Sequence, residues 1–119
     1  MEKVAEWDRE FRIWHYTVSY SQLLLRSINV EGSETRIDVL FSNVSMMNLP
    51  SSLERLRIDR LEPSDPQARA HEGAYQNREI SVYLLGGGEF YIYATHCEWH
   101  EDFGGTRTPS RFGPLRGVE

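Results

Sequence analysis

A dense group of chemically active side chains runs from His96 to Asp102. Within it, His96, Glu98 and His100 stand at every second position, so on a β-strand they share one face. Two imidazoles and one carboxylate are a known ligand set for transition metals. Same-face neighbours on a strand lie about 6.5–7 Å apart, so the strand must bend before all three reach one ion. A metal-binding or small-ligand β-fold built on these three residues is one function that the sequence allows.

The same segment offers little to nucleophilic catalysis. Cys97 follows His96 directly, but neighbours on a strand point to opposite faces, so the two do not form a dyad. His96-Cys97-Glu98 fits the first half of the zinc deaminase motif, whose second half needs two further cysteines that this chain lacks. Neither a Gly-x-Ser-x-Gly elbow nor a His-Glu-x-x-His motif occurs. We therefore expect no catalytic residues and no cofactor, and we expect Cys97 to be a small buried hydrophobe.

An electrostatic interpretation explains this segment better. Residues 89–102 hold four carboxylates and no lysine or arginine, and they include Trp99. An aromatic anchor among carboxylates suits a basic partner protein. The predicted partner-binding residues are Glu98, Trp99, Glu101, Asp102 and Phe103. The alternative is a solvated acidic loop whose tryptophan packs on the core, beside a basic tail at residues 103–119 that folds back over it.

Composition limits the class of protein. A chain of 119 residues with 39% hydrophobic and 26% charged residues is the size and make-up of one globular domain. The net charge of −5 argues against nucleic acid as the main partner. A single cysteine excludes an internal disulfide. No signal peptide and no membrane span is visible, so we expect a cytoplasmic protein with no membrane partner.

Period-two alternation of apolar and polar residues predicts strands in most of the chain. It occurs in five segments: residues 11–28, 37–47, 57–62, 80–84 and 90–95. The first of these is either one bent strand or two strands that turn near Tyr20-Ser21. The three glycines at 86–88 predict a hairpin turn between the last two. Asp65-Pro66 predicts the start of a short helical turn that ends near Gly73, and Ser51 to Glu54 could cap another.

These elements predict one mainly β domain over residues 1–119. We expect an antiparallel barrel, half-barrel or sandwich of five to seven strands with one or two short helical turns. Residues 1–9 are expected to be an N-terminal arm or a single helical turn, and residues 104–119 a tail rich in Gly, Pro and Arg.

Two stretches, Tyr16 to Ser27 and Thr35 to Phe41, resemble small uncharacterised bacterial β-rich proteins, some of which look like immunity proteins of toxin systems. The resemblance implies a binding role and transfers no functional residue. The leading hypothesis is thus a non-enzymatic protein-binding domain, of which an immunity-type inhibitor is one form. The alternatives are the ligand or metal site on His96, Glu98 and His100, and a homodimer formed by strand addition or by burial of Tyr91 and Tyr93.

Overall fold

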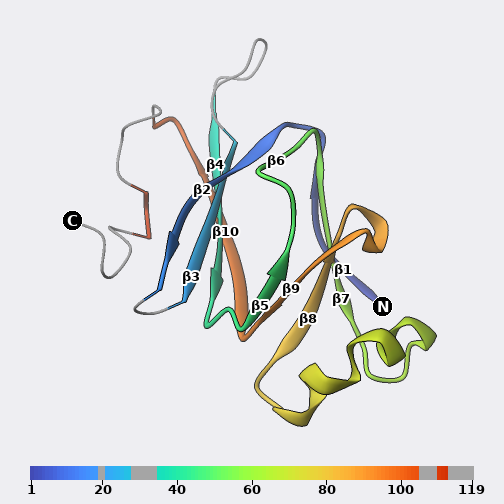
Figure 1. The fold of residues 1–119 in the computed structure, drawn as a ribbon. Coiled ribbons are helices and arrows are strands. Elements are labelled where there is room, and N and C mark those ends of the chain that lie inside the picture. The colour runs from blue at the N-terminus through green and yellow to red at the C-terminus, as the bar shows by residue number, and fades with distance from the viewer. Residues whose placement is uncertain (19–20, 28–34, 105–109, 113–119) are drawn as a thin grey trace.

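The chain folds into two five-stranded antiparallel sheets packed face to face, as a computed structural model shows (Figure 1). The structure describes all residues except 19–20, 28–34, 105–109 and 113–119. The first sheet holds, in spatial order, β1 (Glu2–Trp7), β7 (Leu56–Leu61), β8 (Ser81–Leu85), β9 (Phe90–Ala94) and β5 (Met46–Asn48). The second holds β10 (His96–Asp102), β4 (Arg36–Ser42), β3 (Gln22–Ser27), β2 (Phe11–Thr17) and β6 (Ser52–Leu53).

At two places, a pair of neighbouring chain segments bends and continues from the first sheet into the second. β1 pairs with β7 in the first sheet, and their chain neighbours β2 and β6 pair in the second. In the same way β9 pairs with β5, while their neighbours β10 and β4 pair in the second sheet. At the second crossing Asn43 adopts a left-handed backbone (φ 54°), which asparagine tolerates better than most residues. These crossings join the sheets covalently and fix where β10 begins.

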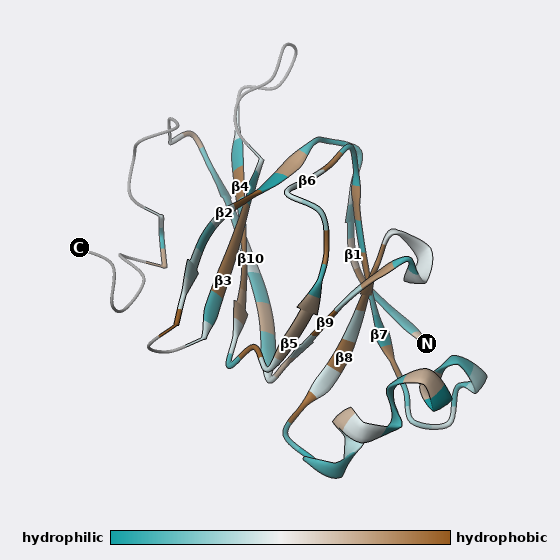
Figure 2. Cartoon of the chain, in the orientation of Figure 1, coloured by the Kyte–Doolittle hydropathy of each residue, from teal (hydrophilic) through white to brown (hydrophobic). Residues whose placement is uncertain are grey.

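The core lies between the inner faces of the two sheets. Alternate residues of β3 and β4 point inward, and Figure 2 shows hydrophobic residues along both strands. They pack against the inward residues of β7, β8 and β9. The fully buried apolar side chains include Phe11, Leu23, Leu25, Ile37, Val39, Phe41, Leu56, Ile58, Leu85 and Ile92. This packing sets the inner and outer faces of every other strand.

A 3-10 segment, η1 (Pro66–Gln76), covers the outer face of the first sheet. Its Ala68 packs with Leu84, and its His71 ring lies 4.8 Å from Tyr91 and 5.5 Å from Tyr93, measured between ring centroids. The Tyr93 hydroxyl lies 2.5 Å from His71 Nδ1. The chain itself therefore half-buries the two tyrosines that the sequence offered as a dimer face. No helix in the described part of the chain is long and apolar enough to cross a membrane.

The outer face of the second sheet buries charge. Arg26 of β3 makes a bidentate ion pair with Asp38 of β4, at 2.6 and 3.1 Å, and both side chains are buried. Trp14 lies over Arg26, with 5.1 Å from its ring centroid to the guanidinium carbon. Phe112, from the C-terminal tail, packs against Leu24 and Leu40 on this face. Charges buried this deeply are tolerated because each guanidinium faces a carboxylate across the ladder.

The structure confirms the mainly β, antiparallel prediction and the 80–95 hairpin, where η2 (Gly86–Gly88) joins β8 to β9. The two sheets form a sandwich, one of the expected architectures. The count of five to seven strands was too low, because the crossing at residues 43–45 splits one predicted strand in two and because β1 and β6 were not predicted as strands.

Three local predictions need correction. Residues 2–7 are a paired strand rather than an arm or helical turn. Residues 52–53 form β6 instead of a helical turn. The predicted turn after Asp65 is η1, which continues past Gly73 to Gln76.

The buried pair generates a stability prediction. Replacing Asp38 with Ala removes the bidentate partner of a guanidinium that stays buried, so the free energy of unfolding should fall by about 3–5 kcal/mol. The double replacement of Arg26 by Met and Asp38 by Leu removes both charges and should recover most of that loss. Urea unfolding of the three proteins measures this. A free energy of unfolding of Asp38→Ala within about 1 kcal/mol of the wild-type value would contradict the role of the pair.

Candidate functional site

β10 is the edge strand of the second sheet, and an ion pair fixes its C-terminal end. Arg36 of β4, which is 1% exposed, donates two hydrogen bonds to Asp102, at 3.0 and 2.8 Å. These hydrogen bonds lower the pKa of Asp102 below its usual value. The backbone N–H of Gly104 donates to the same carboxylate at 2.9 Å. The Asp102 carboxylate, bound by Arg36 and by the Gly104 backbone, therefore fixes the C-terminal end of β10, and we call this set of contacts the clamp.

Further contacts hold β10 along its length. Glu101 accepts a hydrogen bond from the Thr35 hydroxyl and lies 3.8 Å from Arg9, which also donates to Thr35. At the other end of the strand, the Thr95 hydroxyl donates to the Ser42 carbonyl at 3.1 Å. Contacts at both ends of β10 restrict its backbone, and a restricted backbone loses less entropy when it binds a partner.

Two aromatic side chains lie on or beside β10: Trp99 is partly packed against the protein, and Phe103 is almost fully exposed. Trp99 is 42% exposed, and its ring meets Trp7 of β1 edge-on at 5.6 Å. Trp7 in turn contacts Phe11 in the core at 5.4 Å. Phe103, just beyond β10, is 80% exposed. Trp99 thus combines a packed base with a free surface, which is typical of an interface anchor.

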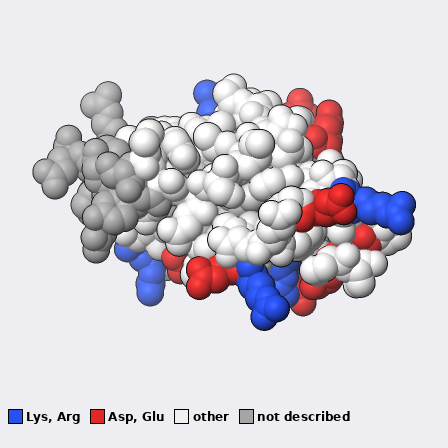
Figure 3. Space-filling model, turned by 60° about the horizontal axis from the view of Figure 1, so that its bottom comes forward, with Lys and Arg blue, Asp and Glu red and all other residues white. Residues whose placement is uncertain are grey.

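The predicted partner-binding residues lie together on β10 but not on one face. Trp99 is cross-strand from the inward-facing Val39, whereas Glu98 and Asp102 are cross-strand from the outward-facing Leu40 and Arg36. Of the carboxylates, Glu101 and Asp102 have partners within the chain, while Glu98 has none among the described residues. In the view of Figure 3, acidic and basic side chains lie side by side on the surface of the molecule. Two of the three carboxylates predicted to bind a partner therefore hold β10 in place within the fold.

The candidate metal ligands follow the strand. His96, Glu98 and His100 share the outer face, as their spacing predicts. His96 uses its Nδ1 in a 2.8 Å hydrogen bond with Thr95, and His100 is cross-strand from Asp38. Within the described residues, no three His, Cys, Asp or Glu side chains are arranged to hold a metal ion. The regular ladder with β4 does not supply the bend that would bring the three together.

Cys97 packs against the core beside Phe41, its cross-strand neighbour. Burial raises the pKa of its thiol to about 12. Because the thiolate is the nucleophilic form, the side chain is inert at neutral pH.

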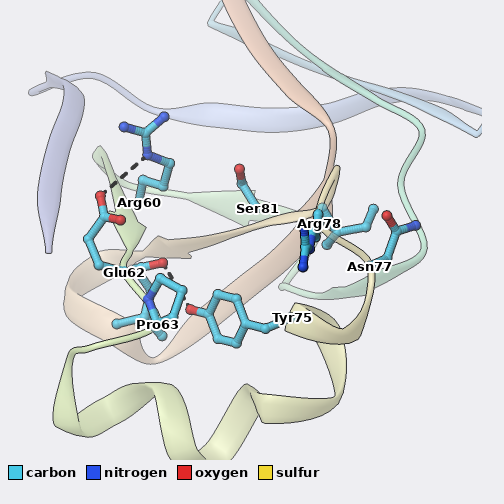
Figure 4. Close-up of a pocket in the computed structure, with 9 residues that line it drawn as sticks. Arg60, Glu62, Pro63, Tyr75, Asn77, Arg78 and Ser81 are labelled. Atoms are coloured by element: carbon cyan, nitrogen blue, oxygen red, sulfur yellow. Dashed lines mark hydrogen bonds and ion pairs between the residues drawn. The ribbon is translucent and has the colours of Figure 1, made fainter.

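A cavity of about 360 Å³ lies between η1 and the first sheet, where Tyr75, Arg78 and Ser81 line it (Figure 4). Its other arginine, Arg60, is paired with Glu62 at 3.8 Å and with Glu2. The Tyr75 hydroxyl donates to the Leu61 carbonyl at 2.9 Å. Most of the polar groups in this cavity have partners within the chain, and no nucleophile–base pair is among them.

The sequence analysis did not identify the residues that hold β10 in place. Arg36, Arg9 and Trp7 come from strands or turns far away in the chain, and no local pattern links them to residues 96–102. One signal was present: Arg36 and Asp38 alternate with apolar residues in a strand that is buried on both faces, and a buried charge requires a partner. Comparison of the chain with family models, curated proteins and solved structures gave no match.

The raised pKa of Cys97 predicts slow alkylation. At pH 8 the folded protein should react with iodoacetamide far more slowly than the protein in urea, where the thiol pKa returns to about 8.5. Mass spectrometry of timed samples measures both rates. Equal rates in the two states would contradict the burial of the thiol.

The clamp at the end of β10 predicts a costly glycine substitution. A Cβ at residue 104 would stand 2.5 Å from the Arg36 guanidinium carbon, so Gly104→Ala must displace the buried arginine. We expect a loss of about 1–3 kcal/mol in the free energy of unfolding. Gly73→Ala is the matched control, because a Cβ there meets nothing within 4 Å. The clamp is refuted if both variants unfold at the same urea concentration.

Proposed function

We propose that this chain is a non-enzymatic protein-binding domain whose binding surface is the open edge of β10. The observation that carries the proposal is the regularity of this edge. β10 has seven residues and pairs with β4 without a register shift, and its other side has no strand partner in the described part of the chain. Such an edge offers unpaired backbone groups to an incoming strand.

The remaining edges are less suited to strand addition. β1 contains a register shift between Lys3 and Ala5, and β5 and β6 have three and two residues. Bulges and short lengths are the devices by which proteins protect their edges. β10 is therefore the best site for a partner strand.

Strand addition also accommodates the division of side chains between two faces. An added strand contacts both faces of β10, so it meets Trp99 and Glu101 on one side and Glu98 on the other. The five predicted residues can then act together although they do not form one patch. An immunity-type inhibitor, to which the resemblance of residues 16–27 points, belongs to this class of protein.

The test is affinity capture with matched variants. The wild type and Glu89→Gln, which removes an exposed carboxylate from the β8–β9 turn, should retain the same partner from the native lysate. Trp99→Ala should weaken binding by about 30-fold, equivalent to about 2 kcal/mol, because a half-exposed aromatic anchor is lost. Phe103→Ala, at an 80% exposed position where folding is little affected, should also weaken it. Equal retention by all four proteins contradicts the proposal.

A further inference from the structure

We propose that the β10 edge is self-complementary and binds the β10 edge of a second copy of this chain, in antiparallel orientation about a two-fold axis at Trp99. This inference rests on the proposed function, because it takes β10 as a binding surface and names the partner. Trp99 is the central residue of the strand, which runs from His96 to Asp102. Pairing about Trp99 therefore overlaps the whole strand in both copies.

The order of charges supports this register. With Trp99 opposite itself, Glu98 of one copy faces His100 of the other, and His96 faces Asp102. Two-fold symmetry repeats each contact, so four histidine–carboxylate pairs form along the outer face. Glu98 has no partner among the described residues of the monomer, so it is available for this contact.

Neighbouring registers lack this complementarity. Centring the pair on Glu98 places that carboxylate opposite its own copy, and centring it on His100 places Glu98 opposite Asp102. Like charges directly opposite one another destabilise a strand pair. Centring the pair on Cys97 or Glu101 also places a histidine opposite a carboxylate, but it overlaps only part of β10 in each copy. The register centred on Trp99 is therefore the one that combines full overlap with opposite charges, whereas charges on an edge usually only prevent pairing.

The inner face agrees with the same arrangement. Trp99 is 42% exposed in the monomer, and the two-fold axis brings two such rings to the same point. Trp7 supports each ring from behind at 5.6 Å. Pairs of aromatic residues across a strand pair add to its stability. The two second sheets would become one continuous sheet through both copies.

The experiment uses two variants that each lose the Glu98–His100 contacts with their own copies and regain complementary contacts with each other. In Glu98→Lys, the new lysine faces His100 of its copy; in His100→Glu, the new glutamate faces Glu98. Each variant alone should associate about tenfold more weakly than the wild type. In an equimolar mixture the new lysine of the first variant faces the new glutamate of the second, and His100 of the first faces Glu98 of the second. The mixture should regain association.

Sedimentation equilibrium at micromolar to millimolar concentration measures the mass. The wild type and the mixture should approach twice 13.9 kDa, and each variant alone should stay near 13.9 kDa. Unfolding curves check the fold of His100→Glu, whose new carboxylate lies cross-strand from Asp38. A wild type that remains monomeric, or a mixture no heavier than its components, overturns the inference. If that happens while Trp99→Ala still weakens capture from the lysate, the proposed function stands with a different partner.

Discussion

The arrangement of this molecule depends on the burial of charge across β3, β4 and β10. Arg26 with Asp38, and Arg36 with Asp102, place two bidentate ion pairs on the outer face of the second sheet, beside the buried Leu24 and Leu40. A mispaired register would leave a guanidinium buried without its carboxylate, at a cost of several kcal/mol. The pairs therefore select one alignment of the three strands. Because Asp102 is the last residue of β10, the same constraint decides where that strand ends and holds Trp99 in place.

The buried ion pairs also determine which side chains of the edge strand β10 are bound within the fold. Its carboxylates at 101 and 102 are bound within the fold, and in the proposed dimer Asp102 also faces a histidine of the second copy. Its length and regular ladder distinguish it from β1, β5 and β6, and its central tryptophan is supported by Trp7. An open and regular edge is the property on which the proposed binding rests, whether the partner is a second copy or another protein.

Much of the fold was predictable from the sequence, because alternation is a local property. Residues 37–41, 80–84 and 90–94 show it clearly and form β4, β8 and β9. The bends at Asn43 and Thr95 and the pairing of residues 2–7 are set by contacts between distant segments, so the strand order and the strand count could not be obtained locally. For the site, the candidate residues chosen from the sequence lie together on or directly after one strand, β10. It could not show that Arg36 and Thr35 engage two of the predicted carboxylates, because those contacts span 66 residues.

Amide hydrogen exchange along β10 tests the central claim most directly. In an edge strand, alternate amides bond to the neighbouring strand and the others face outward. At low protein concentration, the amides of residues 96–102 that bond to β4 should be protected and the others should exchange freely. As the concentration rises, the outward amides should become protected as well, because the edge of a second copy covers them. If the outward amides exchange freely at every concentration and in the presence of the native lysate, β10 is not a binding edge.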